Sequence, residues 1–187
     1  MSAEQQVVVS GAFDDLKSRD LRFLEESSKL GELTVLLWTD HAIQQFSGKP
    51  PEFPLAERSY FLNAVRYVTR IVTLGGSATP DSLPEMPGLR PQFWADVETS
   101  SNPERERFCR GNNFAHRVFT AHELAGFREP PPMPSAPGKK KVVATGCYDS
   151  FHSGHVRFAA SSSEHPRQVC RNAAAPSCEG FKNIYLI

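Results

Sequence analysis

The sequence has no excess of either charge and no long apolar run. Its 187 residues carry 21 lysines and arginines against 21 aspartates and glutamates, so the formal net charge is zero. Proteins that bind nucleic acid usually have a basic excess, which is missing here. No stretch approaches the roughly 18 apolar residues of a membrane span, and the N-terminus lacks a basic and apolar leader. We therefore expect a cytoplasmic protein with no nucleic-acid partner and no membrane span.

Cysteine is also scarce and scattered, with no C-x-x-C pair among Cys109, Cys147, Cys170 and Cys178. This spacing matches neither a disulfide scaffold nor a structural zinc site, so we expect free thiols in a reducing compartment. A site combining Cys147 with His152 and His155 would match no established zinc pattern. The sequence therefore predicts no metal-ligating residue.

What the sequence does contain is an internal repeat. "VVVSGAFDDLKSRDLRFLEE" begins at Val7 and "VVATGCYDSFHSGHVRFAA" begins at Val142. Both stretches are typical of a strand, a glycine turn and a helix. The gapless alignment pairs Gly11 with Gly146, Phe13 with Tyr148, Asp14 with Asp149, Arg22 with Arg157 and Phe23 with Phe158. Because the match is positional rather than compositional, we interpret it as a duplication.

A proline-rich segment separates the two copies. "EPPPMPSAPGKKK" spans Glu129–Lys141, and clustered prolines favour an extended linker over a helix or central strand. After Phe158 the similarity to the first copy ends abruptly, which suggests a shifted reading frame or misplaced splice near Ala159 or Ala160. The predicted organisation is a first domain over 1–128, a linker over 129–140, the start of a second domain over 141–160 and an irregular tail over 161–187.

The first copy alternates short apolar runs with helical patterns. A helix should start near Leu21 and end at Gly31, and Asn102 with Pro103 marks the start of another that ends at Gly111. The apolar spacing of Leu55–Val68 predicts a third helix. The expected strands are Val7–Val9, Leu33–Trp38, Arg70–Leu74 and Ala115–Thr120, whereas Phe93–Glu98 suggests packing only. This alternation predicts an α/β fold, a parallel sheet with helices on both faces.

The string "GCYDSFHSGH" carries the chemistry of the second copy. A glycine after a strand lets the backbone approach a ligand, and a helix starting near His155 would direct its N–H groups at an anion. His152 and His155 could both face one phosphate, with Gly154 leaving the approach open. A bare H-x-G-H would be more typical of two surface histidines in a loop. The preceding strand, glycine, aromatic residue and aspartate favour the phosphate site.

This string resembles the G-x-F-D-x-x-H-x-G-H signature of the cytidylyltransferase-like nucleotidyltransferases. The tandem arrangement is most similar to the two-domain phosphoethanolamine cytidylyltransferases, with the second repeat truncated. The resemblance implies a Rossmann-like fold of the HxGH type. It also implies a role in phospholipid-precursor biosynthesis, with Mg²⁺ as cofactor. The implied reaction transfers a nucleotidyl group from CTP, or from ATP in relatives, to a phosphorylated alcohol such as phosphoethanolamine, and releases pyrophosphate.

The resemblance also implies residue roles. His152 and His155 would be the catalytic pair, binding the triphosphate and stabilising the transition state. The first copy is similar to the family in its E-R-x-x-x-L helix, where Arg58 could bind phosphate or form a helix-start ion pair. The implied nucleotide-binding residues are Gly146, Tyr148, Asp149, Gly154, Lys49 and Arg58.

The first copy departs from the pattern at the catalytic positions. Lys17, Arg19 and Asp20 stand where the second copy has its two histidines and the glycine between them. A bulky Arg19 and a negative Asp20 would both oppose triphosphate binding. Two functions therefore stay open: a nucleotidyltransferase, or a non-catalytic nucleotide-fold module that assembles with an intact partner. Homodimerisation is also left open.

Overall fold

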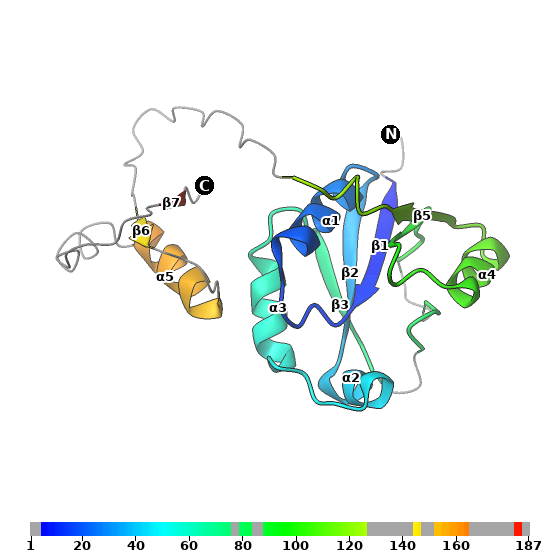
Figure 1. Ribbon diagram of the computed structural model, residues 1–187, viewed down its shortest axis with the longest axis horizontal. Helices are drawn as coiled ribbons and strands as arrows, with labels where there is room; N and C mark the ends of the chain where they lie inside the picture. The colour runs from blue at the N-terminus through cyan, green and yellow to red at the C-terminus, as the bar shows by residue number, and fades with distance from the viewer. Residues whose placement is uncertain are drawn as a thin grey trace. The chain divides into compact units, whose positions relative to one another are not determined.

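The computed structural model describes residues 5–75, 79–83, 88–126, 144–146, 152–164 and 182–184. The chain divides into two compact units, Met1–Arg128 and Glu129–Ile187 (Figure 1). The predicted linker over 129–140 lies outside the described residues, as does most of the predicted tail. None of the helices in the described ranges has the length and apolar character needed to cross a membrane.

The first unit is built on a five-stranded sheet in the order β3-β2-β1-β4-β5. Every pairing in it is parallel, and β1 lies at the centre between β2 and β4. The predicted α/β class, a Rossmann-like parallel sheet, is thereby confirmed. The strands are β1 (Gln6–Gly11), β2 (Glu32–Trp38), β3 (Arg70–Leu74), β4 (Phe93–Val97) and β5 (Ala115–Phe119).

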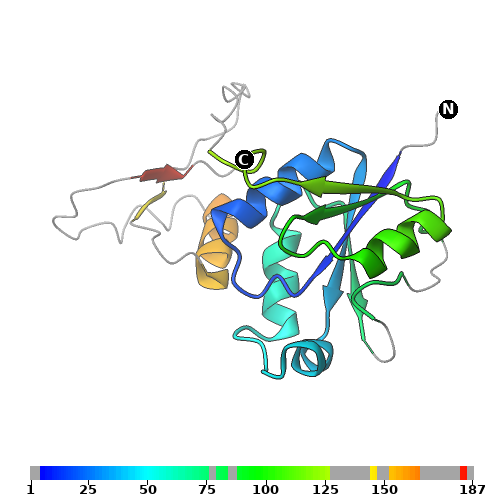
Figure 2. The same cartoon turned by 45° about the vertical axis from the view of Figure 1, so that its right-hand side comes forward.

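Helices cover both faces of this sheet, as Figures 1 and 2 show for α1 and α3 on one side and α4 on the other. Successive side chains of a strand point to opposite faces. Val7 and Val9 therefore belong to one core with Phe23 of α1, while Val8 belongs to the other with Trp94. The helices of this unit are α1 (Ser18–Ser28), α2 (Asp40–Ser47), α3 (Leu55–Asn63) and α4 (Pro103–Gly111).

Cys109 of α4 is buried in the second of these cores. Burial raises the pKa of its thiol to about 11, because the thiolate would lose its hydration there. The side chain therefore acts as a small apolar group beneath α4.

Helix α4 and strand β3 lie where the sequence predicts them. The Asn102 side chain accepts hydrogen bonds from the backbone N–H of Glu104 at 3.0 Å and of Arg105 at 2.9 Å, as an N-cap should.

Gly31 has a φ of +152°, and a Cβ there would lie 2.1 Å from the carbonyl oxygen of Gln5. Only glycine fits this close approach between the end of α1 and the start of the sheet.

The prediction for the third helix was wrong at its end, since α3 stops at Asn63 rather than Val68. Val65 and Val68 nevertheless pack against the first core. They do so from turns in which the N–H of Val65 donates to Leu62 and that of Val68 donates to Val65, each at 3.0 Å. These bonds span three residues, so the apolar spacing continues although the α-helix does not.

Strand β4 and helix α2 were not predicted. β4 occupies the stretch that suggested packing only, and it fills the position beside central β1. Helix α2 begins after Thr39, whose hydroxyl accepts a hydrogen bond from the N–H of Ala42 at 3.3 Å. Threonine followed by aspartate at its start is an ordinary N-cap signal from which the helix could have been predicted.

The second unit contains α5 (Ser153–Glu164) and a short antiparallel pair, β6 (Ala144–Gly146) with β7 (Lys182–Ile184). Helix α5 extends four residues past the predicted boundary at 160, and β7 lies inside the region predicted to be irregular. Alanine and serine after Phe158 do not break a helix, and the next proline in the sequence is Pro166. Composition thus permits the longer helix.

Candidate functional site

The loop after β1 lies at the carboxyl edge of the sheet, where ligands bind in folds of this type. It runs from Ala12 to Lys17 and leads into α1. Phe13 adopts a left-handed φ of +47°, and a Cβ on Gly11 would lie 3.2 Å from its ring. The glycine therefore makes room for the aromatic side chain, and the same pair of residue types recurs as Gly146 and Tyr148.

Asp14 ties this loop to the segment between α2 and α3. Its two carboxylate oxygens accept hydrogen bonds from the backbone N–H of Glu52 at 2.7 Å and of Phe53 at 2.8 Å. A carboxylate that bridges two successive N–H groups fixes both segments at once. Asp14 therefore positions the loop in the first unit.

Arg58 of α3 also binds the loop after β1. Its guanidinium donates to the carbonyl oxygens of Ala12 at 2.6 Å and Phe53 at 2.9 Å, and it pairs with Asp40 at 2.6 Å. The Arg58 side chain is only 1% exposed. Of the two roles predicted for Arg58, the structure contains an ion pair, and phosphate binding stays a prediction.

Lys49 lies exposed just after the left-handed Gly48 that ends α2, and its contact with phosphate also stays a prediction.

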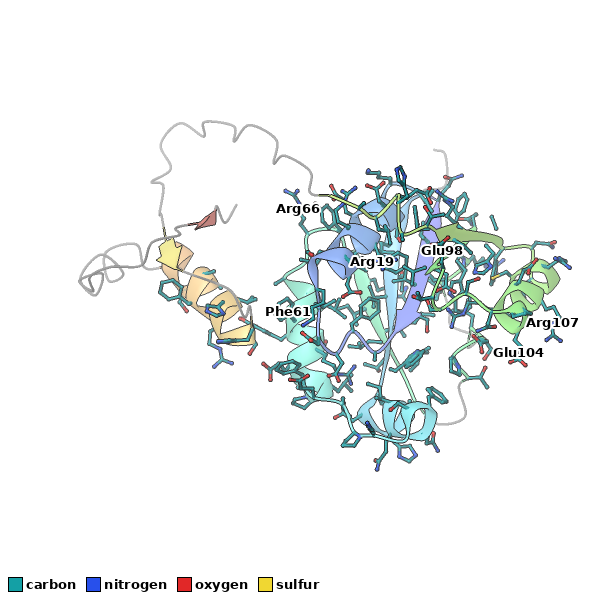
Figure 3. All side chains as sticks on the ribbon, in the orientation of Figure 1. Arg19, Phe61, Arg66, Glu98, Glu104 and Arg107 are labelled. Carbon is teal, nitrogen blue, oxygen red and sulfur yellow. The ribbon has the colours of Figure 1, made fainter. Side chains whose placement is uncertain are left out.

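At the start of α1, acidic side chains bind both the backbone and the side chain of Lys17. The Asp20 carboxylate accepts a hydrogen bond from the backbone N–H of Lys17 at 2.8 Å, as the third residue of a capping box. The Lys17 ammonium in turn forms an ion pair with Asp15. A hydrogen bond from Lys17 to Asp15 raises the pKa of the lysine, and the charge of Glu52 acts in the same direction. Arg19, labelled in Figure 3, is exposed in the first turn.

The start of α5 holds the two histidines close together. The rings of His152 and His155 have centroids 4.0 Å apart. The backbone N–H of His152 donates to Nδ1 of His155 at 3.2 Å, and the N–H of Gly154 donates to Nδ1 of His152 at 3.1 Å. When Nδ1 accepts a hydrogen bond, a neutral imidazole carries its proton on Nε2. The local fold thus selects the tautomer in which Nε2 is the donor.

Gly154 has a steric role in this arrangement. A Cβ at this position would lie 2.7 Å from Cε1 and 2.9 Å from Nδ1 of His152. The ring of His152 therefore occupies the space that any other side chain would need. Of the other predicted site residues in the second unit, Gly146 ends β6, whereas Tyr148 and Asp149 lie outside the described residues.

A charged network beneath α4 was not predicted. Arg105 donates to the buried Asp96 carboxylate at 2.6 Å and pairs with Asp81 at 3.0 Å, and its guanidinium lies over the Trp94 ring. His116 of β5 lies 3.6 Å from the same Asp96 carboxylate. An aspartate inside an apolar strand was the available signal, because a buried charge needs a partner. The network joins β4 to the start of α4.

Comparisons with known proteins place the chain in a family. It is 33% identical over 106 residues to an FAD synthase from Pyrococcus abyssi, an alignment covering 56% of this chain and 67% of that protein. The chain belongs to the nucleotidyltransferase family that includes the archaeal FAD synthases. A second relative in this family, the FAD synthase from Pyrococcus horikoshii, is 37% identical over 68 residues, which is 36% of this chain. The chain thus spans 46% of that second FAD synthase.

The comparison with solved structures gives a more distant match to this chain. A lipopolysaccharide core biosynthesis protein from Thermoplasma volcanium GSS1 matches with a TM-score of 0.49 and 20% sequence identity. The match covers 63% of this chain and 96% of that one. No family model matches the chain. The predicted nucleotidyltransferase relationship is confirmed at the level of the family, and the tandem repeat and the phosphoethanolamine specificity stay predictions.

Proposed function

We propose that this protein acts in nucleotidyl transfer from CTP or ATP to a phosphorylated alcohol, with release of pyrophosphate. The observation that supports this most directly is the paired start of α5, where His152 and His155 lie with ring centroids 4.0 Å apart. Their Nε2 groups are suited to donate hydrogen bonds to triphosphate oxygens, beside the N–H groups of a helix start.

In the proposed reaction, a phosphate oxygen of the acceptor attacks the α-phosphorus of the nucleotide. The bond to the β-phosphate oxygen breaks, and pyrophosphate leaves with the negative charge that develops on it. The two imidazoles need form no covalent bond, because positioning and charge stabilisation suffice for such transfers. His152 and His155 would hold the triphosphate and stabilise the leaving group.

In this proposal, the acceptor of the nucleotidyl group is a phosphate monoester of an alcohol. The resemblance of the HxGH string favours phosphoethanolamine as acceptor and CTP as donor. The relatives are named for FAD, which joins a flavin phosphate to an adenylate, so they favour ATP and a flavin phosphate. Both pairs share the same bond-forming chemistry, and a substrate panel separates them.

Magnesium is implied as cofactor by the family resemblance. The described residues contain no group of three or more histidines, cysteines, aspartates or glutamates arranged to hold a metal ion. Mg²⁺ is commonly bound by substrate phosphates with only one or two protein ligands, so this arrangement fits an ion that enters with the triphosphate. When bound, it would neutralise charge on the phosphate oxygens.

The test is pyrophosphate release by the full chain with CTP and ATP, each against phosphoethanolamine, flavin mononucleotide and other phosphorylated alcohols. We expect His152→Ala to reduce turnover by at least about a hundredfold, the scale for losing a transition-state donor. Lys17→Ala, at the matching position of the first unit, is the control and should change turnover less than about twofold. Absence of turnover across the panel would contradict the proposal.

A second candidate is a non-catalytic nucleotide-fold module that assembles with an intact partner. It is favoured by the first unit, which has Lys17, Arg19 and Asp20 in place of the H-x-G-H residues. This candidate predicts a folded chain that binds CTP and ATP weakly or not at all. Measured turnover that depends on His152 would eliminate it.

A further inference from the structure

The two helix starts of the repeat share one backbone design but differ in charge. In α1, the side chain of Asp20 accepts the N–H of Lys17 at 2.8 Å. In α5, the side chain of His155 accepts the N–H of His152 at 3.2 Å. The capping residue and its acceptor occupy aligned positions in both copies. The same cap is therefore built with a carboxylate in one unit and an imidazole in the other.

We infer that Asp20 is an internal anion that occupies the start of α1 and excludes nucleoside triphosphate from the first unit. This inference rests on the proposed function in taking His152 and His155 as the triphosphate ligands. The cap N–H has an acceptor in both units, so the two helix starts differ in the charge of that acceptor, which is a carboxylate in α1 and an imidazole in α5. The negative charge of the Asp20 carboxylate repels a triphosphate at close range.

The neighbouring charges reinforce the exclusion. Lys17 is the cation best placed to attract a phosphate at this point, and it is paired with Asp15. Glu52, on the segment that Asp14 holds against the loop, also acts on Lys17 through its charge. Around this lysine the structure thus gathers Asp15, Asp20 and Glu52. Counted with the exposed Arg19, the start of α1 has two cationic side chains against these three carboxylates.

The steric difference acts in the same direction. Where the second unit has Gly154, whose missing Cβ makes room for the His152 ring, the first unit has Arg19. A ring at the Lys17 position could not fold over the helix start as His152 does, because the side chain of residue 19 begins in that space. Charge and shape at three aligned positions therefore separate the two copies.

The experiment measures ATP and CTP binding, each with Mg²⁺, by isothermal titration calorimetry on the full chain. All variants carry His152→Ala and His155→Ala, so that α5 contributes no histidine. We expect Asp20→Asn to tighten triphosphate binding by a few-fold, since asparagine keeps an acceptor for the cap but removes the charge. We expect Lys17→His with Arg19→Gly and Asp20→His to tighten it by at least about tenfold, the scale of one added charge-assisted contact.

Glu104→Gln is the matched control, because Glu104 is an exposed carboxylate in the first turn of α4 (Figure 3). It should leave triphosphate affinity unchanged. If it raises affinity as much as Asp20→Asn does, net charge explains the effect and the inference fails. It also fails if the triple variant melts like the parent by circular dichroism but binds no more tightly. Loss of the α5 histidines without any change in binding would instead overturn the proposed function.

Discussion

Helices α1 and α5 lie in the two stretches that the sequence alignment pairs, yet α1 carries the packing and α5 carries the proposed chemistry. Phe23 of α1 is 8% exposed and meets Phe119 edge-on with ring centroids 6.0 Å apart, whereas the aligned Phe158 of α5 is 44% exposed. At the helix starts the contrast reverses, with a self-capping carboxylate in α1 and two histidines in α5. Two helices with aligned sequences can therefore differ both in the residues that pack and in the residues at the helix start.

The largest effect expected from this contrast is on stability. Phe23→Ala should reduce the free energy of unfolding by about 3–5 kcal/mol, because it leaves a cavity between α1 and β5. Phe158→Ala, which removes the same atoms from a half-exposed position, should cost less than about 1 kcal/mol. Urea unfolding followed by circular dichroism measures both, because helices of both units contribute to that signal. Equal losses would show that α5 packs as tightly as α1.

The next effect tests how the loop after β1 is held in the first unit. Arg58→Ala removes a buried guanidinium that bonds to Ala12, Phe53 and Asp40, so we expect a loss of about 2–4 kcal/mol. Arg66→Ala is the control, since Arg66 is exposed and donates a hydrogen bond to the hydroxyl of the adjacent Tyr67 at 2.9 Å (Figure 3). That control should cost less than about 1 kcal/mol. The same substitution cannot be made in the second unit, because no E-R-x-x-x-L segment follows α5 in the given sequence.

A smaller effect separates binding from stability in the second unit. Gly154→Ala would push the His152 ring out of its place while improving helix propensity. We expect about a tenfold weaker triphosphate affinity, equal to about 1.4 kcal/mol, with no loss of thermal stability. Arg19→Ala, at the aligned position of α1, should change neither quantity. A variant that binds normally would show that the ring position is not needed.

The smallest effect concerns the end of the first unit, where pH should have a local influence. The N–H of Thr120, its hydroxyl and Arg117 stabilise the Glu123 carboxylate and lower its pKa to about 2. Because this pKa is depressed in the folded state, the stabilisation is complete above an unfolded value of about 4.3 and disappears as pH falls toward 2. Melting temperatures of the parent and Glu123→Gln should therefore converge between pH 4.5 and about 2. A constant difference over that range would contradict the assignment.

Much of the first unit could be predicted because its local signals agree with the final packing. The Asn102–Pro103 start of α4 and the apolar run of β3 coincide with the structure. The end of α3 could not be predicted, since Val65 and Val68 keep an apolar spacing while the chain forms turns. Strand β4 could not be predicted because its sequence has no strand pattern of its own. Its place beside β1, and the pairing of Asp96 with Arg105 of α4, depend on residues far away in the sequence.

The candidate site divides in the same way. The placement of His152 and His155 beside a helix start followed from their spacing. Gly154 was predicted to leave the approach of a phosphate open, whereas in the structure the space beside it is taken by the His152 ring. The burial of Arg58 could not be read from sequence, since its partners Ala12 and Asp40 lie on other elements. Long-range partners of this kind depend on how the elements are assembled.

The buried thiol of Cys109 makes local opening of the first unit measurable by chemical labelling. A thiol with a pKa of about 11 beneath α4 reacts with a maleimide only when that helix lifts from the sheet. With the other cysteines replaced by serine, the labelling rate would report how often this part of the molecule opens. Slow opening could thus be followed in native buffer, one alkylation at a time, without any denaturant.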